Sequence, residues 1–224
     1  PADMKKIMII AKKYKLKVLE DNCEAFGAKY LNKYCGVIGD AGVASFDFGK
    51  VITCGEGGLI TTNSKKIYTY CREYHDHGHQ NNPNLPRGRD TKKIFGFNYR
   101  LTELQAVICK VQLKKLNYII NQNKKRYKIL EKILVNFFEL RLIPKESQII
   151  YDTFIFFVED INKRKKIIKL LNERKIGTKN LPDAIEWHCS YYWGHMLNKT
   201  TIKSNIKSKN ILLKAIAIPI SLKK

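Results

Sequence analysis

Residues 41–58, with the sequence AGVASFDFGKVITCGEGG, constrain the fold of this chain more than any other stretch. Residues 43–48 alternate between small or apolar and polar side chains, which is the pattern of a strand buried on one face. Gly49 ends that pattern, Lys50 follows it, and three more glycines precede a second strand-like run at residues 59–62. The sequence therefore predicts two strands with Lys50 on the turn between them.

Lys50 has the setting of a lysine that forms a Schiff base. A lysine held by a strand and a glycine-rich turn has little freedom to swing into water, and partial burial lowers the pKa of an amine. A lower pKa frees the nitrogen lone pair for attack on an aldehyde. Taken alone, however, Lys50 would be interpreted as one of the many solvated lysines of the chain.

A carboxylate accompanies this lysine. Residues 16–20 form a short strand-like run that leads to Asp21, and open α/β sheets bind ligands at the ends of their strands. A helical pattern at residues 3–14 precedes this run, as in a doubly wound sheet. An acid that pairs with a pyridinium nitrogen and a lysine that binds an aldehyde are the groups that pyridoxal phosphate requires of a protein.

Five separated blocks of the sequence resemble the DegT-type nucleotide-sugar aminotransferases in their order and their spacing. These blocks are residues 20–27 (EDNCEAFG), 36–40 (GVIGD), 45–50 (SFDFGK), 55–58 (GEGG) and 96–106 (GFNYRLTELQA). The resemblance runs from about Pro1 to Ile220. It implies an α/β fold, that of a fold type I pyridoxal phosphate transferase, with a partial large α/β/α domain and a small α+β C-terminal domain.

The same resemblance implies the domain boundaries. Residues 1–100 would form the partial large cofactor-binding domain, residues 101–140 a long linking helix, and residues 141–224 the small domain. Thr102 and Gln105 match a capping box at the start of the linking helix. We also expect the chain to be a fragment that lacks the N-terminal part of the large domain, including its phosphate loop.

The resemblance assigns cofactor-binding roles to five residues. Lys50 would be the catalytic residue, which bonds the cofactor and then moves a proton, and Asp21 would pair with the pyridinium nitrogen. Ser45 would contact the cofactor phosphate, and Asn98 would reach the phosphate held by the neighbouring subunit. Glu24 falls near the phenolic oxygen, where the resembling proteins often have Gln or His. The structural alternatives are a locally bonded Ser45, an Asn98 that only caps the next helix, and a Glu24 that faces solvent.

Arg100 and His77 are the expected substrate-binding residues, and they flank the long loop at residues 80–95. Cys71 and the alternating histidines His75, His77 and His79 also suggest a metal site. Alternate histidines in an extended segment converge only if the chain folds back, and no residues that would orient them are evident. We therefore expect a polar active-site loop and no metal.

The formal net charge of +22 raises nucleic acid or an anionic membrane as a partner. The 34 lysines and 8 arginines are spread along the chain among many Ile and Asn residues, which is more typical of biased codon usage than of a binding patch. No apolar run approaches the length of a membrane span. The six cysteines form no CxxC pair, so reduced thiols and a cytoplasmic location are expected.

The activity that the resemblance implies is the pyridoxal phosphate-dependent transfer of an amino group. The donor would be an amino acid such as glutamate, the acceptor a nucleotide-linked keto sugar, and the enzyme a homodimer with shared active sites in surface glycan or sugar synthesis. One alternative is the sugar 3-dehydratase branch of the family, in which histidine replaces the lysine, so Lys50 argues against it. The other alternative is a non-catalytic remnant or a basic protein that binds nucleic acid or a protein partner.

Overall fold

The computed structural model describes residues 1–86, 88–90 and 93–220 and divides the chain into two compact units. The first unit comprises residues 1–118 and 143–150, and the second comprises residues 119–142 and the chain from residue 151 onward. These limits differ from the boundaries at 100 and 140 that the sequence suggested. Residues 143–150 belong to the first unit because β7 (Ser147–Gln148) pairs with β2 (Lys29–Tyr30).

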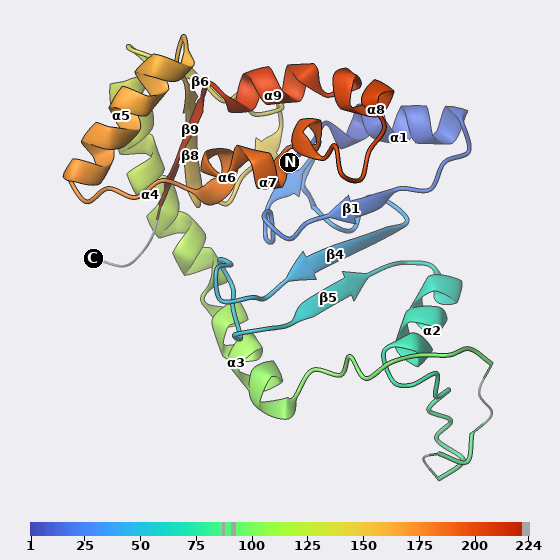
Figure 1. The fold of residues 1–224 in the computed structure, drawn as a ribbon. Coiled ribbons are helices and arrows are strands. Elements are labelled where there is room, and N and C mark those ends of the chain that lie inside the picture. The colour runs from blue at the N-terminus through green and yellow to red at the C-terminus, as the bar shows by residue number, and fades with distance from the viewer. Residues whose placement is uncertain (87, 91–92, 221–224) are drawn as a thin grey trace. The chain divides into compact units, whose positions relative to one another are not determined.

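A three-stranded sheet organises the first unit, with the strand order β1-β4-β5 (Figure 1). β1 (Leu19–Asp21) and β4 (Ala41–Ser45) are parallel, and Asp21 lies opposite Val43. β5 (Gly58–Thr61) is antiparallel to β4, and Gly58 lies opposite Ser45. The carboxyl ends of β1 and β4 therefore meet at one edge of the sheet, where the turn that carries Lys50 begins.

The helices of the first unit begin at the capping residues that the sequence offers. Asp3 caps α1 (Met4–Lys13), and its side chain accepts a hydrogen bond from the backbone N–H of Lys6. Ser64 caps α2 (Lys65–Tyr74), and both hydrogen bonds of the Thr102–Gln105 capping box are present at α3 (Glu103–Lys114). The expected long helix is interrupted at Lys115, after which α4 (Leu116–Leu134) follows.

A short strand, β3 (Lys33–Tyr34), pairs with β2.

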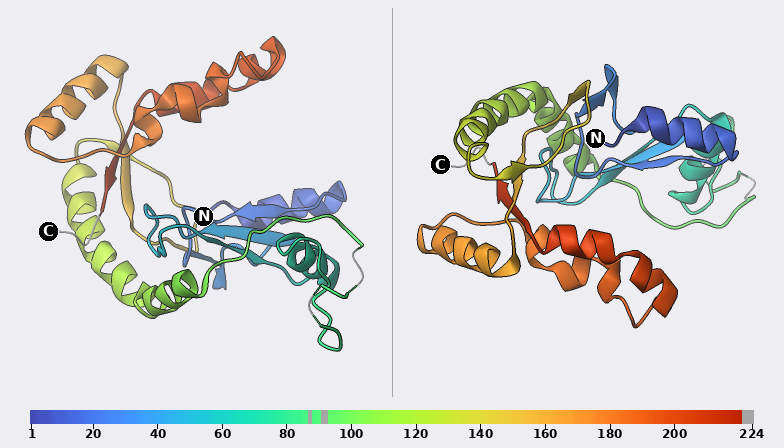
Figure 2. Two further views of the ribbon diagram at one scale, coloured as in Figure 1. Left: turned by 60° about the horizontal axis from the view of Figure 1, so that its bottom comes forward. Right: turned by 90° about the horizontal axis from the view of Figure 1, so that it is seen from above.

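The second unit is built on an antiparallel sheet with the order β6-β8-β9. β8 (Thr153–Phe157) and β9 (Ala215–Pro219) run side by side, and β6 (Glu139–Leu140) pairs with β8 (Figure 2). Phe154 is fully buried, and its ring centroid lies 4.7 Å from that of Tyr127 on α4. The other described helices of the second unit are α5 (Ile161–Glu173), α6 (Asn180–Asp183), α7 (Ile185–His188), α8 (Lys199–Ser204) and α9 (Ile206–Leu212), with a 3-10 turn at Ser190–Tyr192.

None of the helices among the described residues is long and apolar enough to cross a membrane.

Glu20 is a buried carboxylate that fixes the loop beside β1. It is 8% exposed, and its two oxygens accept hydrogen bonds from the backbone N–H groups of Gly36 (2.8 Å), Ile38 (2.6 Å) and Gly39 (2.6 Å). The same loop passes so close to β4 that a Cβ atom on Gly42 would lie 2.1 Å from the carbonyl oxygen of Gly36. Glu20 therefore anchors the segment that packs against the strand ending at Asp21.

Replacing Glu20 with alanine should lower the free energy of unfolding by about 2–4 kcal/mol, because three backbone N–H groups lose their acceptor. Urea titration followed by circular dichroism measures this loss. Glu56→Ala is the matched control, since the Glu56 side chain is exposed, and it should change the same quantity by less than about 0.5 kcal/mol. Equal effects of the two substitutions would contradict the anchoring role of Glu20.

Candidate active site

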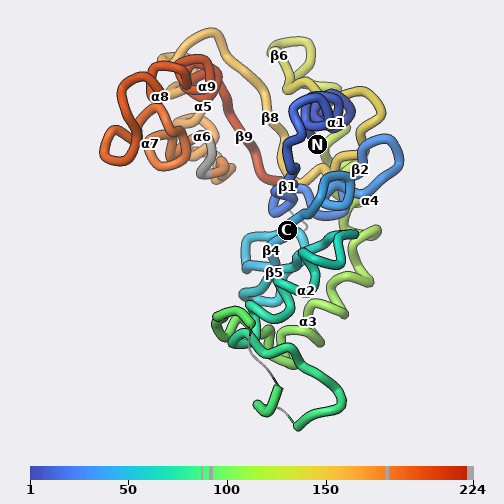
Figure 3. The backbone as a smooth tube through the Cα atoms, turned by 90° about the vertical axis from the view of Figure 1, so that its right-hand side faces the viewer, coloured from blue at the N-terminus to red at the C-terminus, as the bar shows by residue number. Residues whose placement is uncertain are grey.

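The edge of the sheet where β1 and β4 end brings together residues that are far apart in sequence. Asp21 is the last residue of β1, Ser45 is the last residue of β4, and Lys50 lies on the turn that follows. Figure 3 shows β1 and β4 close to each other in the first unit. Because parallel strands end on the same side of a sheet, the pairing of β1 with β4 places Asp21 and Ser45 at one edge. The sequence predicted this meeting of a carboxylate with a lysine-bearing turn.

Hydrogen bonds hold the backbone of the Lys50 turn. Asp47 Oδ1 accepts from the backbone N–H of Gly49 at 2.5 Å, and the backbone N–H of Lys50 donates to the carbonyl oxygen of Asp47 at 3.1 Å. Further along, the backbone N–H of Cys54 donates to the carbonyl oxygen of Phe46 at 3.0 Å. Phe46 is 4% exposed and packs edge-on against Phe26, with the ring centroids 5.3 Å apart. The turn is therefore a fixed platform for the Lys50 side chain.

Lys50 is enclosed by carboxylates. Its side chain is 17% exposed, its Nζ donates a hydrogen bond to Glu24 Oε1, and Asp47 Oδ2 lies 3.8 Å from Nζ. Glu24 therefore does not simply face solvent, although its side chain is 67% exposed. The sequence placed Glu24 near the site but gave no indication that it would pair with Lys50.

The expectation that burial would lower the pKa of Lys50 is wrong for this arrangement. Burial does act to lower the pKa, but the hydrogen bond and charge of Glu24, with a further contribution from Asp47, outweigh it and raise the pKa above its ordinary value. The turn does exclude solvent from Lys50, but the nearby anions decide the direction of the pKa shift. Lys50 is therefore an ammonium group at neutral pH.

Asp21 remains ionised at this edge. Hydrogen bonds from the Cys23 thiol and from the Cys23 backbone N–H, the latter at 3.1 Å, lower the pKa of Asp21, and the charge of Lys50 lowers it further. Burial and the Asp21 carboxylate raise the pKa of Cys23 to about 11, so this thiol stays protonated. Cys23 thus acts as a hydrogen-bond donor, and Asp21 presents a full negative charge that suits a cationic ring nitrogen.

Ser45 makes a local hydrogen bond, as one interpretation of the sequence had it. Its Oγ accepts from the backbone N–H of Asp47 at 3.3 Å, and the residue is partly exposed. A serine hydroxyl that accepts one hydrogen bond can also donate one, so this bond is compatible with the phosphate contact that was expected. That contact stays a prediction.

Arg100, Asn98 and His77 gather in the loop that follows α2. Arg100 Nη1 donates to Asp76 Oδ1 at 2.8 Å, and Asp76 is 5% exposed. Asn98 forms a β-bridge with Asp76, and its Oδ1 accepts from the backbone N–H of Arg100 at 3.4 Å. His77 is exposed and has a positive φ of 56°. Among the described residues, the hydrogen bonds of Arg100 and Asn98 go to neighbours in the loop, and the His77 ring lies against that of His79. The expected roles of these three residues in binding stay predictions.

A second carboxylate orders the same loop. Asp90 accepts hydrogen bonds from the backbone N–H of Asn81 at 2.8 Å and from His79 Nδ1 at 3.0 Å, and the hydrogen bond with His79 is the main cause of its lowered pKa. Burial acts to raise the pKa of Asp76, but hydrogen bonds from Arg100 and Asn81 outweigh it and lower the pKa. Both carboxylates are therefore ionised in the ordered loop.

We expect this loop to lose its order when the pH falls below about 4. A carboxylate whose pKa is lowered by folding contributes stability above its unfolded pKa of about 3.9, and this stability is lost as the pH falls through the lower, folded value. Hydrogen exchange of residues 75–86 at pH 7 and pH 3, corrected for intrinsic rates, should show a loss of protection that α3 does not share. Proportional losses in both segments would show that Asp76 and Asp90 do not control the loop.

The metal-binding interpretation of Cys71 and the histidines has no geometric support in the described part of the chain. His75 Nδ1 lies 2.5 Å from the carbonyl oxygen of Arg72, whereas His79 Nδ1 contacts Asp90. Among the residues described, no group of three or more His, Cys, Asp or Glu side chains is placed to hold a metal ion.

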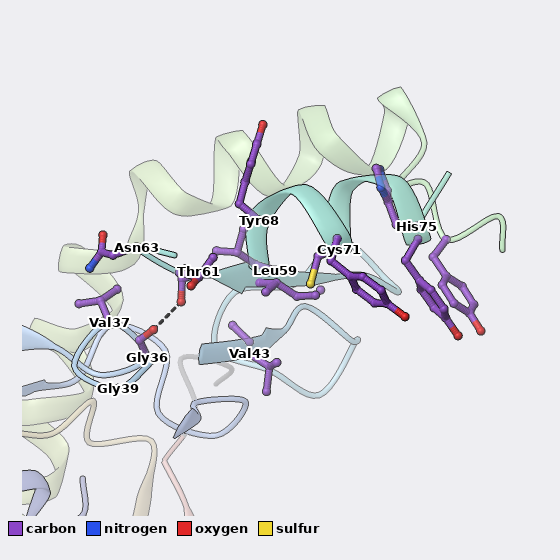
Figure 4. A pocket seen from close by; sticks show the side chains of 17 residues that line it. Gly36, Val37, Gly39, Val43, Leu59, Thr61, Asn63, Tyr68, Cys71 and His75 are labelled. Carbon is purple, nitrogen blue, oxygen red and sulfur yellow. Dashed lines mark hydrogen bonds between the residues drawn. The ribbon is translucent and has the colours of Figure 1, made fainter. Parts of the chain in front are cut away.

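A pocket of about 890 Å³ lies between α2 and the strands β4 and β5. Figure 4 shows Cys71 of α2 and Leu59 of β5 at this space, next to the hydrogen bond that Thr61 Oγ1 donates to the carbonyl oxygen of Gly36. The residues that line this pocket are mainly apolar and aromatic, and they include neither Lys50 nor Asp21. This pocket is thus not where the charged groups meet, and we place the candidate chemistry at the edge of the sheet.

Two residues that shape the site were not predicted from the sequence. Asp47 organises the turn through the backbone N–H of Gly49, and the run Asp47-Phe48-Gly49 offers the signal of an Asx turn that would have found it. Asp76 holds Arg100 from 24 positions away, and no local pattern signals that pairing.

One protein-family model matches nearly the whole chain, and two curated relatives match more than two thirds of it. The model of the DegT/DnrJ/EryC1/StrS aminotransferase family matches residues 1–222. GDP-perosamine synthase of Escherichia coli O157:H7 is 36% identical over 155 residues, which cover 69% of this chain and 40% of that protein. The dTDP-3-amino-3,6-dideoxy-alpha-D-galactopyranose transaminase of Aneurinibacillus thermoaerophilus is 36% identical over 182 residues, which cover 79% of this chain and 46% of that protein.

Solved structures show the same fold. The putative sugar aminotransferase Spr1654 from Streptococcus pneumoniae, in its PLP-form, superposes with a TM-score of 0.82 at 16% sequence identity. The superposition covers 100% of this chain and 61% of that one. The chain therefore spans less than half the length of the two curated relatives named above and about three fifths of this structural neighbour.

Proposed function

The chain belongs to the DegT/DnrJ/EryC1/StrS aminotransferase family, and we propose that the protein containing it transfers an amino group from an amino acid to a nucleotide-linked keto sugar. The family match confirms the family predicted from the sequence, and the superposition confirms the predicted fold type I α/β architecture. One observation carries the proposal beyond the family: Lys50 and an ionised Asp21 meet at the carboxyl edge of parallel strands.

The groups at this edge fit pyridoxal phosphate. A partly buried lysine can bond an aldehyde, an ionised carboxylate can pair with a pyridinium nitrogen, and a serine hydroxyl can donate to a phosphate. When bound, pyridoxal phosphate supplies an electron sink that makes the α-hydrogen of an amino acid acidic. Lys50, Asp21 and Ser45 would hold it, with Glu24 close to Lys50 and Asn98 contributed by the partner subunit of a homodimer.

Lys50 would carry out both halves of the transfer. Its Nζ would hold the cofactor by its aldehyde group and would also be the base that takes the proton from the donor α-carbon. In the second half, the same nitrogen would return a proton to the carbon of the keto sugar that receives the amino group. Asp21 would stay ionised throughout and hold the ring nitrogen protonated.

The substrate class follows from the relatives. Their names include a GDP-sugar synthase and a dTDP-sugar transaminase, so the acceptor would be a keto sugar on a nucleoside diphosphate and the donor an amino acid such as glutamate. The net charge of +22 would favour such an anionic substrate. We place the enzyme in the cytoplasm, in glycan or sugar synthesis. By the family resemblance, the lysine at position 50 argues against the dehydratase alternative.

Transfer of isotope from donor to acceptor tests this function. The protein would be incubated with pyridoxal phosphate, ¹⁵N-glutamate and a panel of GDP- and dTDP-linked keto sugars, and the sugar products would be analysed by mass spectrometry. We expect ¹⁵N in an amino sugar from at least one acceptor, together with an equal amount of 2-oxoglutarate. Loss of a hydroxyl group without nitrogen incorporation would support the dehydratase, and no reaction with any acceptor would contradict the proposal.

A further inference from the structure

Lys50 has a partner of its own before any ligand arrives. Its Nζ donates to Glu24 Oε1, and this carboxylate comes from the segment after β1, 26 positions earlier in the chain. The other charged or titratable groups that face Lys50 are Asp47, Asp21 and the Cys23 thiol. An amine held in an ion pair cannot attack a carbonyl carbon, because its lone pair carries a proton.

Glu24 differs from Asp47 in how easily it can leave. Asp47 lies farther from Nζ, at 3.8 Å, and its other oxygen accepts from the backbone N–H of Gly49, so it is bound into the turn. Glu24 is 67% exposed, whereas Lys50 is only 17% exposed. An ion pair with an exposed carboxylate contributes little stability, so an incoming anionic or carbonyl ligand can displace Glu24 at little cost.

We propose that Glu24 is a positioning residue that keeps the Lys50 amine protonated and in place until a ligand displaces the Glu24 carboxylate. When Glu24 swings out, the ammonium group loses its main counter-charge, so a larger fraction of the Lys50 side chains gives a proton to water or buffer and is present as neutral amine. No electrons are exchanged in this step. The part of the inference that concerns the amine stands on the ion pair itself, and only its use in loading a cofactor rests on the proposed function.

Acetylation of Lys50 measures the availability of its amine without any cofactor. Acetic anhydride acylates neutral amines only: the lysine nitrogen bonds the acyl carbon, acetate leaves, and a proton passes to the buffer. Labelling of the full chain between pH 6 and pH 10, followed by digestion and mass spectrometry, gives a rate for each lysine. The other 33 lysines serve as internal standards for reagent and unfolding.

Glu24→Gln should increase the labelling rate of Lys50 about three- to tenfold at pH 8, and shift its pH profile to lower pH, because the amide keeps the shape but not the charge. Glu24→Asp, which keeps the charge, should lie nearer to the unsubstituted chain. Asp47→Asn is the matched control and should increase the rate less than twofold. A change of less than twofold in Glu24→Gln, or an equal rise in Asp47→Asn, would overturn the inference.

A second experiment separates this inference from the proposed function. The protein is incubated with pyridoxal phosphate and then reduced with borohydride, which traps the cofactor on the lysine that binds it. If pyridoxal phosphate is trapped on Lys50 but Glu24→Gln leaves the acetylation rate unchanged, the role of Glu24 is refuted and the function stands. If acetylation rises as expected but no cofactor is trapped on Lys50, the control of the amine by Glu24 is supported and the proposed function is refuted.

Discussion

Replacement of Lys50 by alanine should lower the kcat for amino transfer at least about 1,000-fold, because one side chain supplies both the cofactor bond and the proton transfer. Glu24 loses its partner in this variant, but it is 67% exposed, so no buried charge is left behind. The variant should therefore keep the circular dichroism spectrum of the unsubstituted protein. Steady-state assays with an acceptor that the isotope-transfer experiment identifies measure the loss.

Two further variants make this result specific to the amine. Lys66→Ala, on the exposed side of α2, removes a lysine of the same unit and should leave kcat unchanged within about twofold. Lys50→Arg keeps the positive charge beside Glu24 but cannot bond an aldehyde, so it should be as inactive as the alanine variant. Multiple turnovers by Lys50→Ala at more than a tenth of the normal rate would refute the catalytic role.

Asp21→Asn should lower kcat about 100-fold or more, because an amide cannot hold a ring nitrogen protonated. The substitution keeps the shape of the side chain and an oxygen that can accept from the Cys23 backbone N–H, so the edge of the sheet should remain intact. Because the pKa of Asp21 is lowered, the carboxylate is ionised from about pH 5 upward, and the loss should be constant between pH 6 and pH 9.

Asp47→Asn is the matched control for this second prediction. It removes a charge from the same edge of the sheet but keeps an Oδ1 that can accept from the backbone N–H of Gly49, so the Lys50 turn should stay intact. We assign Asp47 no contact with a cofactor, so kcat should change by less than about threefold. If Asp21→Asn and Asp47→Asn reduce kcat equally, the effect of Asp21 is one of general charge rather than of pairing with a ring nitrogen. A rate within a few fold of normal in Asp21→Asn would refute the pairing.

Local signals explain what could be predicted from the sequence. The strand–turn–strand run around Lys50, the capping box at Thr102 and the strand that ends at Asp21 each depend on residues within a few positions of one another. Parallel pairing of β1 with β4 then places Asp21 near the Lys50 turn. The five blocks that resemble the family lie on these same elements.

Contacts between distant residues explain what could not be predicted. Glu24 reaches Lys50 across 26 positions, and this contact reverses the expected direction of the Lys50 pKa shift. Asp76 accepts a hydrogen bond from Arg100 across 24 positions. Residues 147–148 belong to the first unit because they pair with β2. Such pairings depend on how the elements pack, which periodicity along the chain does not encode.

Covalent trapping locates the cofactor-binding lysine most directly. The protein would be incubated with pyridoxal phosphate, reduced with borohydride and digested, and the pyridoxyl label would be located by mass spectrometry. We expect the label to be concentrated on Lys50, and Lys50→Ala to lose it without gaining label elsewhere. A label spread over many of the 34 lysines in proportion to their exposure, or one that persists undiminished in Lys50→Ala, would contradict the assignment of Lys50 as the cofactor-binding residue.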